Sequence, residues 1–368
     1  MTKSETVKLI DVCKSIFAGG DVPKDNYSLE QDDFYSVPIY TNGEQNLGLY
    51  GYTTKARVEE PSITVSARGT IGFTAIRTKP FYPAIRLITL TPNERIDIQY
   101  LYYVTKNYKF DNGGTSIPQL TVPMLKNYSF PLPDLETQRK IASNLDKVTH
   151  TIDLCNAILE KLDMLVKSRF VEMFGDPVYN TNSLPVKCLG DLGEWASGGT
   201  PSRAINEYFD GSINWYSAGE LNSLFLEGSI EKITEEAILN SSAKLFKAGS
   251  MLVGMYDTAA FKMGILKEDS ASNQACACIT PNNSVNIIWL YYELQMMKNH
   301  FLSQRRGVRQ KNLNLGMIRS FEIPIADIKK QYEFAAFVEQ TDKSKSAVKK
   351  LLEKAETLKK ALMQEYFG

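Results

Sequence analysis

Histidine and cysteine, the side chains most used for nucleophilic catalysis and zinc binding, are scarce in this 368-residue chain. Its two histidines, His150 and His300, leave no nucleophile–base–orienter set. Cys276 and Cys278 share one face of an expected strand, but the chain offers no four-ligand zinc site around them. Five scattered cysteines without a secretory context predict reduced thiols, as in a cytoplasmic protein.

Long apolar runs, targeting signals and nucleotide-binding loops are also missing. No apolar run is long enough to span a bilayer, and residues 1–4 have no signal-peptide core behind them, so we expect no membrane partner. No Walker-type phosphate loop occurs.

Two fragments resemble parts of enzymes without the rest of the enzyme. Asp176–Tyr179 resembles the loop by which amino-methyltransferases hold a target base, but no glycine-rich turn for S-adenosylmethionine lies upstream. Asp134 and Glu136 resemble part of a nuclease core that lacks its Glu-x-Lys, and they are better interpreted as the start of a helix. These absences predict a chain that is not an enzyme and holds no catalytic residue, metal or cofactor.

Charge is balanced overall but unevenly distributed. Forty-two Lys and Arg residues offset 42 Asp and Glu residues, which argues against a protein that coats nucleic acid indiscriminately. Residues 51–133 hold 10 basic and 5 acidic side chains, and residues 298–319 hold 6 basic and no acidic ones. Such stretches, taken alone, are most often ordinary solvated surface. On a neutral protein they also suit selective contact with phosphate groups.

The most informative feature that is present is an internal repeat. The segment Asp134–Gly175 recurs 193 positions later as Asp327–Gly368. Gln138 matches Gln331 near the start, and Glu-Met-Phe-Gly at the end of the first copy matches Glu-Tyr-Phe-Gly at the end of the second. A match at both borders with no change of offset indicates a true repeat.

Apolar residues in the first copy recur at alternating steps of four and three, the a/d spacing of a helix that packs lengthwise on another helix. Each copy predicts a helix of about 40 residues and about 60 Å, which needs a partner for its apolar stripe. The second copy is more polar, and Leu351, Leu358 and Leu362 are expected to widen its stripe. We expect the two helices to pack antiparallel; the alternative is that each packs as core against its own domain. The predicted seam residues are Ile141, Leu145, Val148, Ile152, Leu159, Leu162, Phe334, Val338, Val348, Leu352 and Ala355.

The segments before the two copies predict globular blocks of one plan. Each opens with a strand-like segment and a double glycine, at 19–20 and 198–199. A strand–turn–strand segment, an aromatic-rich helix, a polar glycine-bearing loop and a short strand ending in proline follow in both. The predicted fold class is α+β, with two mixed α/β domains joined and spaced by two long antiparallel helices that form a coiled coil, in pseudo-twofold internal symmetry. The predicted boundaries are 1–133 (first domain), 134–176 (first spacer helix), 177–326 (second domain) and 327–368 (second spacer helix).

Short motifs in the second block strengthen this plan. They are Ser197–Arg203, Glu207–Gly211, Ile213–Trp215, Gly219–Asn222, Ser241–Leu245 and Asn273–Cys276, with Phe130–Pro133 and Ile323–Ile325 at the two helix starts. Together with the order of block, helix, block, helix, they resemble the specificity (S) subunit of type I restriction–modification systems over essentially the whole chain. The sequence departs from the usual pattern at Asp257, where these domains commonly have glycine, and at Ala326-Asp327, which replaces a proline-rich helix start.

The resemblance implies that each block is a target recognition domain that reads one half of a split double-stranded DNA site. It implies that the paired helices set the half-site spacing and dock two modification (methyltransferase) subunits, which bind S-adenosylmethionine. Restriction (translocase and nuclease) subunits join that assembly where they are present. The chain itself is then the non-catalytic subunit of an adenine-specific DNA methyltransferase and type I restriction endonuclease.

A protein that reads DNA places side chains against base edges and holds phosphates with Arg, Lys and main-chain amides. Glycine-bearing loops suit both tasks. In the first domain the candidate DNA-contacting residues are Thr41, Asn42, Lys55, Arg57, Arg68, Thr70, Arg77, Lys79, Thr115, Ser116 and Gln119. In the second domain they are Thr200, Ser202, Arg203, Trp215, Tyr216, Tyr256, Asp257, Lys262, Arg309, Gln310, Lys311 and Asn312.

The residues leave open a second class of function, a non-enzymatic coiled-coil scaffold or protein-interaction adaptor whose globular ends bind proteins. Basic, glycine-bearing loops at equivalent places in both blocks favour the DNA-binding interpretation. A gel shift with and without a methyltransferase partner separates the two.

Overall fold

The computed structural model of the chain describes residues 5–109, 119–303 and 312–368, without the side chain of Asp257. Two compact units make up the chain. Unit 1 comprises Met1–Asn156 and Lys350–Gly368, and unit 2 comprises Ala157–Lys349. Each unit therefore contains one β-rich domain and about half of each long helix.

Unit 1 holds a four-stranded sheet, a three-stranded sheet and a two-stranded pair, in the orders β2-β8-β5-β6, β4-β3-β7 and β1-β9. Its strands are β1 (Glu5–Lys8), β2 (Cys13–Ala18), β3 (Val37–Tyr40), β4 (Leu49–Thr53), β5 (Ser62–Val65), β6 (Thr74–Arg77), β7 (Tyr82–Pro83), β8 (Ile88–Pro92) and β9 (Ser129–Leu132). The short helices α1 (Ile98–Asn107) and α2 (Val122–Lys126) complete the domain. The apolar faces of α1, β5 and β8 share one core.

Unit 2 holds a five-stranded sheet, a three-stranded sheet and a two-stranded pair, in the orders β11-β18-β15-β16-β13, β14-β12-β17 and β10-β19. Its strands are β10 (Val186–Cys188), β11 (Gly193–Ser197), β12 (Ile213–Tyr216), β13 (Phe225–Leu226), β14 (Glu231–Ile233), β15 (Met251–Gly254), β16 (Met263–Leu266), β17 (Ala271–Ser272), β18 (Cys276–Pro281) and β19 (Glu322–Pro324). Its short helices are α4 (Glu235–Leu239), α5 (Ile287–Ser303) and α6 (Leu315–Ser320).

The two domains share one topology. β3 pairs antiparallel with β4 and parallel with β7, as β12 does with β14 and β17. The main sheets repeat one order, β2-β8-β5-β6 in unit 1 and β11-β18-β15-β16 in unit 2, where β13 adds an edge strand. An antiparallel pair, β1–β9 or β10–β19, closes each domain just before a long helix. The repeat found in the sequence therefore extends to the folds of the blocks.

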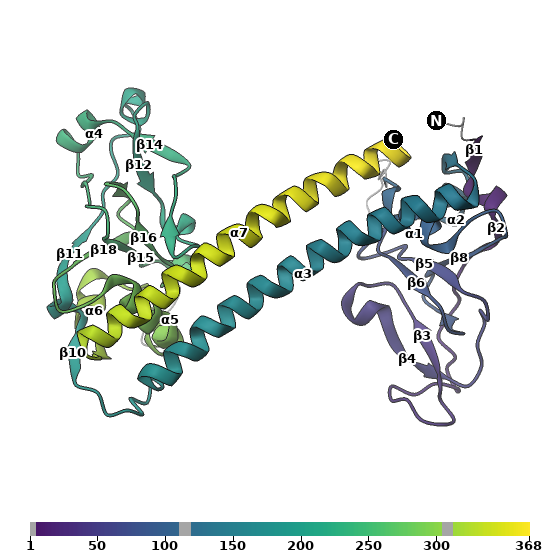
Figure 1. Cartoon of the computed structure of the whole chain (residues 1–368), viewed down its shortest axis with the longest axis horizontal. Helices are drawn as coiled ribbons and strands as arrows, with labels where there is room; N and C mark the ends of the chain where they lie inside the picture. The colour runs from purple at the N-terminus through teal and green to yellow at the C-terminus, as the bar shows by residue number, and fades with distance from the viewer. Residues whose placement is uncertain (1–4, 110–118, 304–311) are drawn as a thin grey trace. The chain divides into compact units, whose positions relative to one another are not determined.

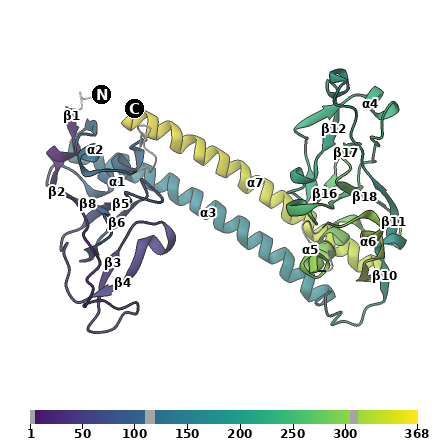
Figure 2. The same cartoon turned by 180° about the vertical axis from the view of Figure 1, so that it is seen from behind.

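The long helices α3 (Leu135–Phe174) and α7 (Ile328–Phe367) each contain 40 residues. Their first residues are 193 positions apart (328 − 135), as are their last (367 − 174). Each helix ends at a glycine of positive φ, Gly175 (+78°) and Gly368 (+88°), a backbone conformation that glycine adopts without cost. Figures 1 and 2 show the two helices side by side.

The two helices run antiparallel. In unit 1 the core contains Leu145 from the first half of α3 and Phe367 from the end of α7, whose ring lies 5.4 Å from that of Tyr100. In unit 2 the rings of Phe170, near the end of α3, and Phe334, near the start of α7, are 5.3 Å apart. The predicted fold class, mixed α+β with two β-rich domains and two long helices packed together, is confirmed.

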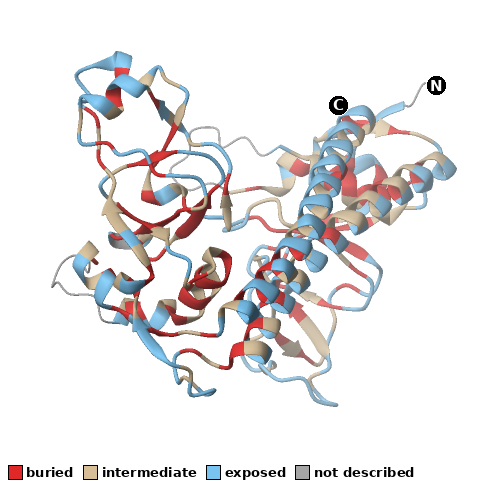
Figure 3. Ribbon diagram, turned by 60° about the vertical axis from the view of Figure 1, so that its left-hand side comes forward, coloured by how far each residue is buried: buried red, intermediate tan, exposed pale blue. Residues whose placement is uncertain are grey.

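The predicted seam positions are all covered to some degree. Leu145, Phe334, Val338 and Ala355 are buried, and the half-buried ones are Ile141, Val148, Ile152, Leu159, Leu162, Val348 and Leu352. Leu351 and Leu358 are 50% and 49% exposed, so the expectation that they widen the stripe is wrong. One residue turns an α-helix by about 100°, which carries these two leucines off the seam. Figure 3 shows exposed residues over much of the surface of both helices.

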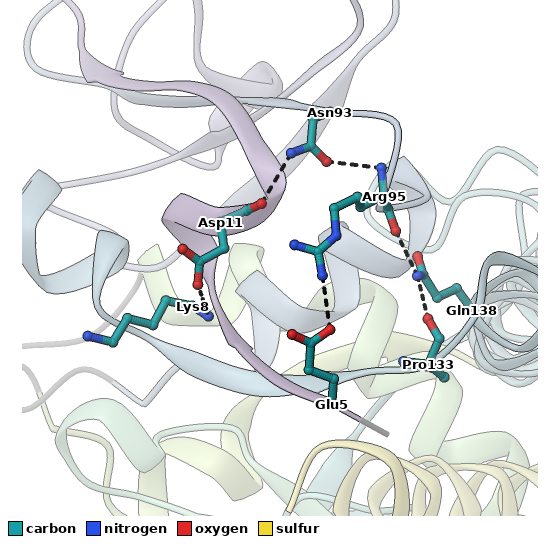
Figure 4. A network of polar contacts seen from close by, with 7 residues as sticks. All are labelled: Glu5, Lys8, Asp11, Asn93, Arg95, Pro133 and Gln138. Atoms are coloured by element: carbon teal, nitrogen blue, oxygen red, sulfur yellow. Dashed lines mark hydrogen bonds and ion pairs between the residues drawn. The ribbon is translucent and has the colours of Figure 1, made fainter. Parts of the chain in front are cut away.

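A buried glutamine ties α3 to the domain of unit 1. The amide oxygen of Gln138 accepts a hydrogen bond from the backbone N–H of Asp97 at 2.8 Å. Its NH2 group donates to the carbonyls of Arg95 (3.0 Å) and Pro133 (2.8 Å). The guanidinium of Arg95 in turn pairs with Glu5 of β1 at 3.0 Å, so one network joins the helix, the loop before α1 and the first strand (Figure 4).

Gln331 does the same in unit 2. Its amide oxygen accepts from the backbone N–H of Asn286 at 2.8 Å, and its NH2 group donates to the carbonyl of Ala326 at 2.9 Å. Asp97 and Asn286 cap the N-termini of α1 and α5 by accepting backbone N–H bonds. Each glutamine therefore joins a long helix to the N-terminus of the main domain helix.

Candidate nucleic-acid interface

Four segments far apart in the sequence of unit 1 meet beyond the C-terminal ends of β3, β5 and β7. They are residues 41–43, 66–73, 84–87 and 119–120, which we call the first loop cluster. The N–H of Gly43 donates to Ser66 Oγ at 3.1 Å, and the N–H of Leu120 donates to the carbonyl of Ala67 at 3.0 Å. Backbone hydrogen bonds therefore fix the loops against one another.

Asn42 joins three of these segments. Its Oδ1 accepts from the N–H of Ala67 at 2.7 Å, and its Nδ2 donates to the carbonyl of Ile85. The side chain uses its oxygen and its NH2 group inside the domain. Asn42 therefore holds three segments of the cluster together, and its predicted contact with DNA stays a prediction.

The segment 84–87 has an unusual backbone. Ile85 and Arg86 have φ angles of +50° and +62°, which non-glycine residues, and β-branched ones above all, rarely adopt. The N–H of Ile85 donates to the carbonyl of Gly20 at 2.7 Å, and the N–H of Arg86 donates to that of Gly19 at 3.1 Å. These bonds hold a strained turn in place at the edge of the cluster.

Unit 2 carries a second loop cluster at the same topological positions, made of residues 217–220, 255–262, 273–276 and 312–313. The N–H of Met255 donates to the carbonyl of Ala275 at 2.9 Å, and the N–H of Leu313 donates to that of Met255 at 2.8 Å. Lys262 Nζ donates to the carbonyl of Gly219 at 3.3 Å. The two clusters differ in their side chains and share their scaffold.

The double glycines noted in the sequence lie beneath these clusters. A Cβ on Gly19 would stand 2.5 Å from the carbonyl oxygen of Pro83, and a Cβ on Gly198 would stand 2.3 Å from that of Ser272. Any side chain at either position would push the following turn away. These glycines therefore serve close packing inside each domain.

The clusters gather part of the predicted DNA-contacting set. In unit 1 the structure brings together Thr41, Asn42, Arg68, Thr70 and Gln119. Arg68 Nη2 donates to Gln119 Oε1 at 2.9 Å, which joins two predicted residues 51 positions apart. In unit 2 the cluster contains Tyr256, Lys262 and Asn312, and Thr200 borders it through a hydrogen bond to Gln274.

Three predicted contacts are wrong because the side chains are buried. The guanidinium of Arg77 lies 3.6 Å from the ring centre of Tyr40 and donates to the carbonyl of Leu47 at 2.6 Å. Burial lowers the pKa of Arg77, because desolvation disfavours its charged form. Trp215 and Tyr216 lie in the interior of unit 2. A DNA groove cannot reach any of the three.

Other candidates are exposed but lie outside the clusters. Arg203 forms a two-pronged ion pair with Glu231, with Nη2 2.8 Å from Oε2, and its guanidinium lies 4.3 Å from the ring centre of Phe209. The hydrogen bonds that Arg203 donates to the Glu231 carboxylate raise the pKa of Arg203. Lys55, Arg57, Lys79 and Ser202 are exposed in loops elsewhere.

Some predictions fall outside the described residues. These are Thr115, Ser116, Arg309, Gln310 and Lys311, together with the side chain of Asp257.

The exposed cluster residues that the sequence did not single out include Arg86 in unit 1 and Gln274 in unit 2. Both lie in the turn that follows the short strand β7 or β17. The positive φ angles that present Arg86 have no signature in the sequence, because neither Ile nor Arg marks such a turn.

Three further features concern metal ligands, thiols and apolar helices. Over residues 5–109, 119–303 and 312–368, no three His, Cys, Asp or Glu side chains are grouped to hold a metal ion. Burial raises the pKa of Cys276 to about 12, so its thiol stays protonated at neutral pH. Among the same residues no helix combines the length and apolar character needed to cross a membrane.

The family model for the type I restriction modification DNA specificity domain matches residues 1–164 and 184–357. The chain therefore belongs to the type I restriction–modification specificity (S) subunits, a family of non-catalytic subunits.

Relatives agree with this family. A type I specificity subunit of Mycoplasma pneumoniae is 39% identical over 139 residues, which are 38% of this chain and 41% of the relative. A second subunit from the same organism is also 39% identical over 139 residues, 38% of its length, so the chain spans about two fifths of both. The specificity subunit of the type I restriction enzyme EcoR124I/EcoR124II of Escherichia coli is 24% identical over 331 residues, 84% of this chain and 80% of that one.

Solved structures share the fold. The crystal structure of a type I restriction–modification S subunit from M. genitalium superposes with a TM-score of 0.68 at 14% identity, covering 100% of this chain and 97% of the other. A chain from a study of the assembly and conformational transition of the type I system gives 0.58 at 14% identity, covering 100% and 98%.

Proposed function

We propose that this chain is the DNA sequence-specificity subunit of a type I restriction–modification complex and that each β-rich domain reads one half of a bipartite double-stranded site. The observation that carries the proposal is the pair of loop clusters, which have one scaffold and unlike side chains. Arg68, Thr70 and Gln119 stand in the first cluster, where the second has Tyr256, Lys262 and Asn312. Equivalent platforms with unlike surfaces suit two unlike half-sites.

The side chains of the first cluster have the chemistry of base readout. One guanidinium N–H of Arg68 donates to Gln119 Oε1, and the side chain is exposed. Its remaining N–H donors are therefore available to acceptors such as the O6 and N7 atoms of guanine. The hydrogen bond also limits the rotamers of Arg68. A preordered arginine loses less entropy when it meets a base edge.

The paired helices set the distance between the half-sites. Forty residues at about 1.5 Å each make a rod of about 60 Å. At about 3.4 Å per base pair, that length corresponds to at most roughly 17 base pairs, less than two turns of the duplex. Both half-sites then lie within reach of one specificity chain.

The same helices dock two modification subunits. On α3, Ile158 and Leu165 are 43% and 49% exposed in unit 2. Their repeat partners on α7 (158 + 193 and 165 + 193) are Leu351 and Leu358, which are also exposed, in unit 1. Pairs of apolar side chains seven residues apart form a stripe on which a helix of another protein can pack. Two equivalent patches suit two methyltransferase copies.

Catalysis then belongs to those partners, which bind S-adenosylmethionine, while this chain contributes recognition. Restriction subunits join where the complex contains them. The chain alone, given S-adenosylmethionine and DNA, is expected to transfer no methyl groups.

Methylation mapping tests the proposal directly. Genomic DNA from cells that express the chain with its cognate methyltransferase should carry methyl groups at one bipartite motif, two specified halves separated by a fixed unspecified spacer. A continuous motif, or methylation that does not depend on this chain, would contradict the proposal. A gel shift of the mapped duplex with the chain, with and without the methyltransferase, separates DNA recognition from a scaffolding role.

A further inference from the structure

The two partners of Asn42 have a common feature. Oδ1 accepts from the N–H of Ala67, and Nδ2 donates to the carbonyl of Ile85. The next residue in the chain is an exposed arginine in both cases, Arg68 and Arg86. One amide therefore sets the backbone immediately before two arginines that lie 18 positions apart in the sequence.

Arg86 is held on a turn with little freedom. Its φ of +62° follows that of Ile85 at +50°, and their two N–H groups donate to the carbonyls of Gly19 and Gly20. Strained backbone of this kind persists only where surrounding bonds enforce it, and it is concentrated at sites that bind ligands.

The guanidinium of Arg86 is available to a ligand. Within the described residues it forms no hydrogen bond, ion pair or ring contact. Arg77, by contrast, is buried against Tyr40. A guanidinium stays charged at neutral pH and offers several N–H donors in one plane. Held on a rigid turn and without a partner, it can contact a phosphate or a base edge.

We propose that Arg86 is a second DNA-contacting arginine of the first domain and that Asn42 is the positioning residue that sets Arg86 and Arg68 relative to each other. The inference rests on the proposed function, since it needs the first loop cluster to meet DNA. The equivalent turn of unit 2 carries Gln274, whose Oε1 accepts from the hydroxyl of Thr200. Arg86 therefore serves the first half-site alone.

Replacing Arg86 with glycine tests the contact and spares the fold. The measurement is the dissociation constant of the full chain, in complex with its methyltransferase, for a duplex that carries the mapped site. Arg86→Gly should weaken binding roughly tenfold. It should not lower the unfolding temperature, because glycine adopts a φ of +62° readily. The control is Lys24→Ala, which removes an exposed charge of the same domain outside the cluster and should bind like wild type.

Duplexes with single base changes locate the effect. Arg86→Gly should alter discrimination or affinity at the first half-site and leave the penalties for changes in the second half-site as they are. If Arg86 contacts a phosphate, Arg86→Lys should retain binding, because lysine keeps the charge. If two N–H donors of Arg86 bind one base, Arg86→Lys should lose binding. Either result supports the contact, whereas wild-type binding by Arg86→Gly would overturn it.

A double-mutant cycle tests the positioning role of Asn42. If Asn42 acts through the two arginines, Asn42→Ala combined with Arg86→Gly should bind no more than about twofold more weakly than the weaker single variant. Asn42→Ala should also change base preference in the first half-site, a readout that a general loss of stability would not move. Fully additive losses with unchanged preference would overturn this role.

Binding of the wild-type complex and of the Arg86→Gly complex separates the proposed function from the role of Arg86. A wild-type complex that ignores the mapped duplex would contradict the proposed function and this inference with it. A wild-type complex that binds the duplex, beside an Arg86→Gly complex that binds equally well, contradicts only the inference.

Discussion

The two buried glutamines at the starts of the long helices are the residues with the clearest structural role. Gln138 and Gln331 each satisfy the N–H of a helix-capping residue, Asp97 or Asn286, and donate to nearby carbonyls. Truncating either side chain leaves those buried groups without partners. Leaving one such group unsatisfied costs about 1–3 kcal/mol.

We therefore expect Gln138→Ala and Gln331→Ala each to lower the free energy of unfolding by at least about 2 kcal/mol. The effect should appear in the urea-induced unfolding of the unit that contains the change. Gln340→Ala, an exposed glutamine of α7, is the matched control and should stay within about 0.5 kcal/mol of wild type. Similar unfolding curves for all three variants would contradict the assigned role.

Glu293 is a second residue whose surroundings have a measurable effect on stability. It is buried in unit 2, and its Oε1 has no hydrogen-bond partner among the described residues. Burial raises its pKa to about 8, from an ordinary value of 4.5. The equivalent position of α1, counted from the helix cap, is the buried Val104. A carboxyl group thus occupies a place where the other domain has an alkyl group.

The folded state keeps the proton of Glu293 over a pH range in which the unfolded state releases it. The contribution of Glu293 to the free energy of unfolding is therefore fully present below about pH 4.5. It falls as pH rises and is lost above about pH 8. Glu293→Gln should flatten this loss, so the variant gains stability relative to wild type between pH 5 and pH 8. Thermal unfolding across that range measures it, and the transition of unit 1 is the internal control. Parallel pH profiles for variant and wild type would rule the explanation out.

At the scale of elements, the helices of the repeat were the most predictable part of the chain. Their observed bounds, Leu135–Phe174 and Ile328–Phe367, fall within a few residues of the predicted spacer segments. Long periodic patterns with a cap at one end and glycine at the other constrain a helix from many positions at once. A strand or loop residue has no such redundancy.

The burial of the candidate DNA-contacting residues was less predictable for that reason. Arg77 lies in a short strand and looks like a surface charge, yet the ring of Tyr40 and the carbonyl of Leu47 bury it. Trp215 and Tyr216 look like stacking platforms and lie inside unit 2. Burial of each depends on segments distant in sequence, and no local pattern reports it. Loop positions such as Arg68 and Gln119 were easier to recognise, because nearby glycines and basic residues mark an exposed loop in the sequence.

The exposed apolar pairs on the helices lead to a prediction about stoichiometry. Ile158→Glu with Leu165→Glu should remove one methyltransferase from the assembly, and Leu351→Glu with Leu358→Glu should remove the other. Each buried leucine or isoleucine contributes about 1.5–3 kcal/mol to such a contact, so a double change weakens docking at least a hundredfold. Native mass spectrometry counts the bound subunits. Asn156→Glu places a glutamate on the same helix but off the patch, and this variant should retain both subunits.

At the scale of the whole molecule, helix length should determine which DNA sites are recognised. Seven residues added after Asp153 and seven after Ser346 preserve the heptad frame at the middle of both helices. The addition lengthens the pair by about 10 Å, equivalent to roughly three base pairs. We expect the mapped motif to keep both halves and gain a longer spacer. An unchanged spacer would refute the idea that the helices measure distance.

The antiparallel pairing of β10 with β19 has a consequence for how such chains diversify. The pair brings the place where the chain enters the second domain next to the place where it leaves for α7. Everything between the two strands can be exchanged for an unrelated sequence of like fold while α3 and α7 keep their heptads. Under the proposed function, a recombination event that spans this interval would give the chain a new half-motif in one step, with no matching change in a methyltransferase that docks on the two helices.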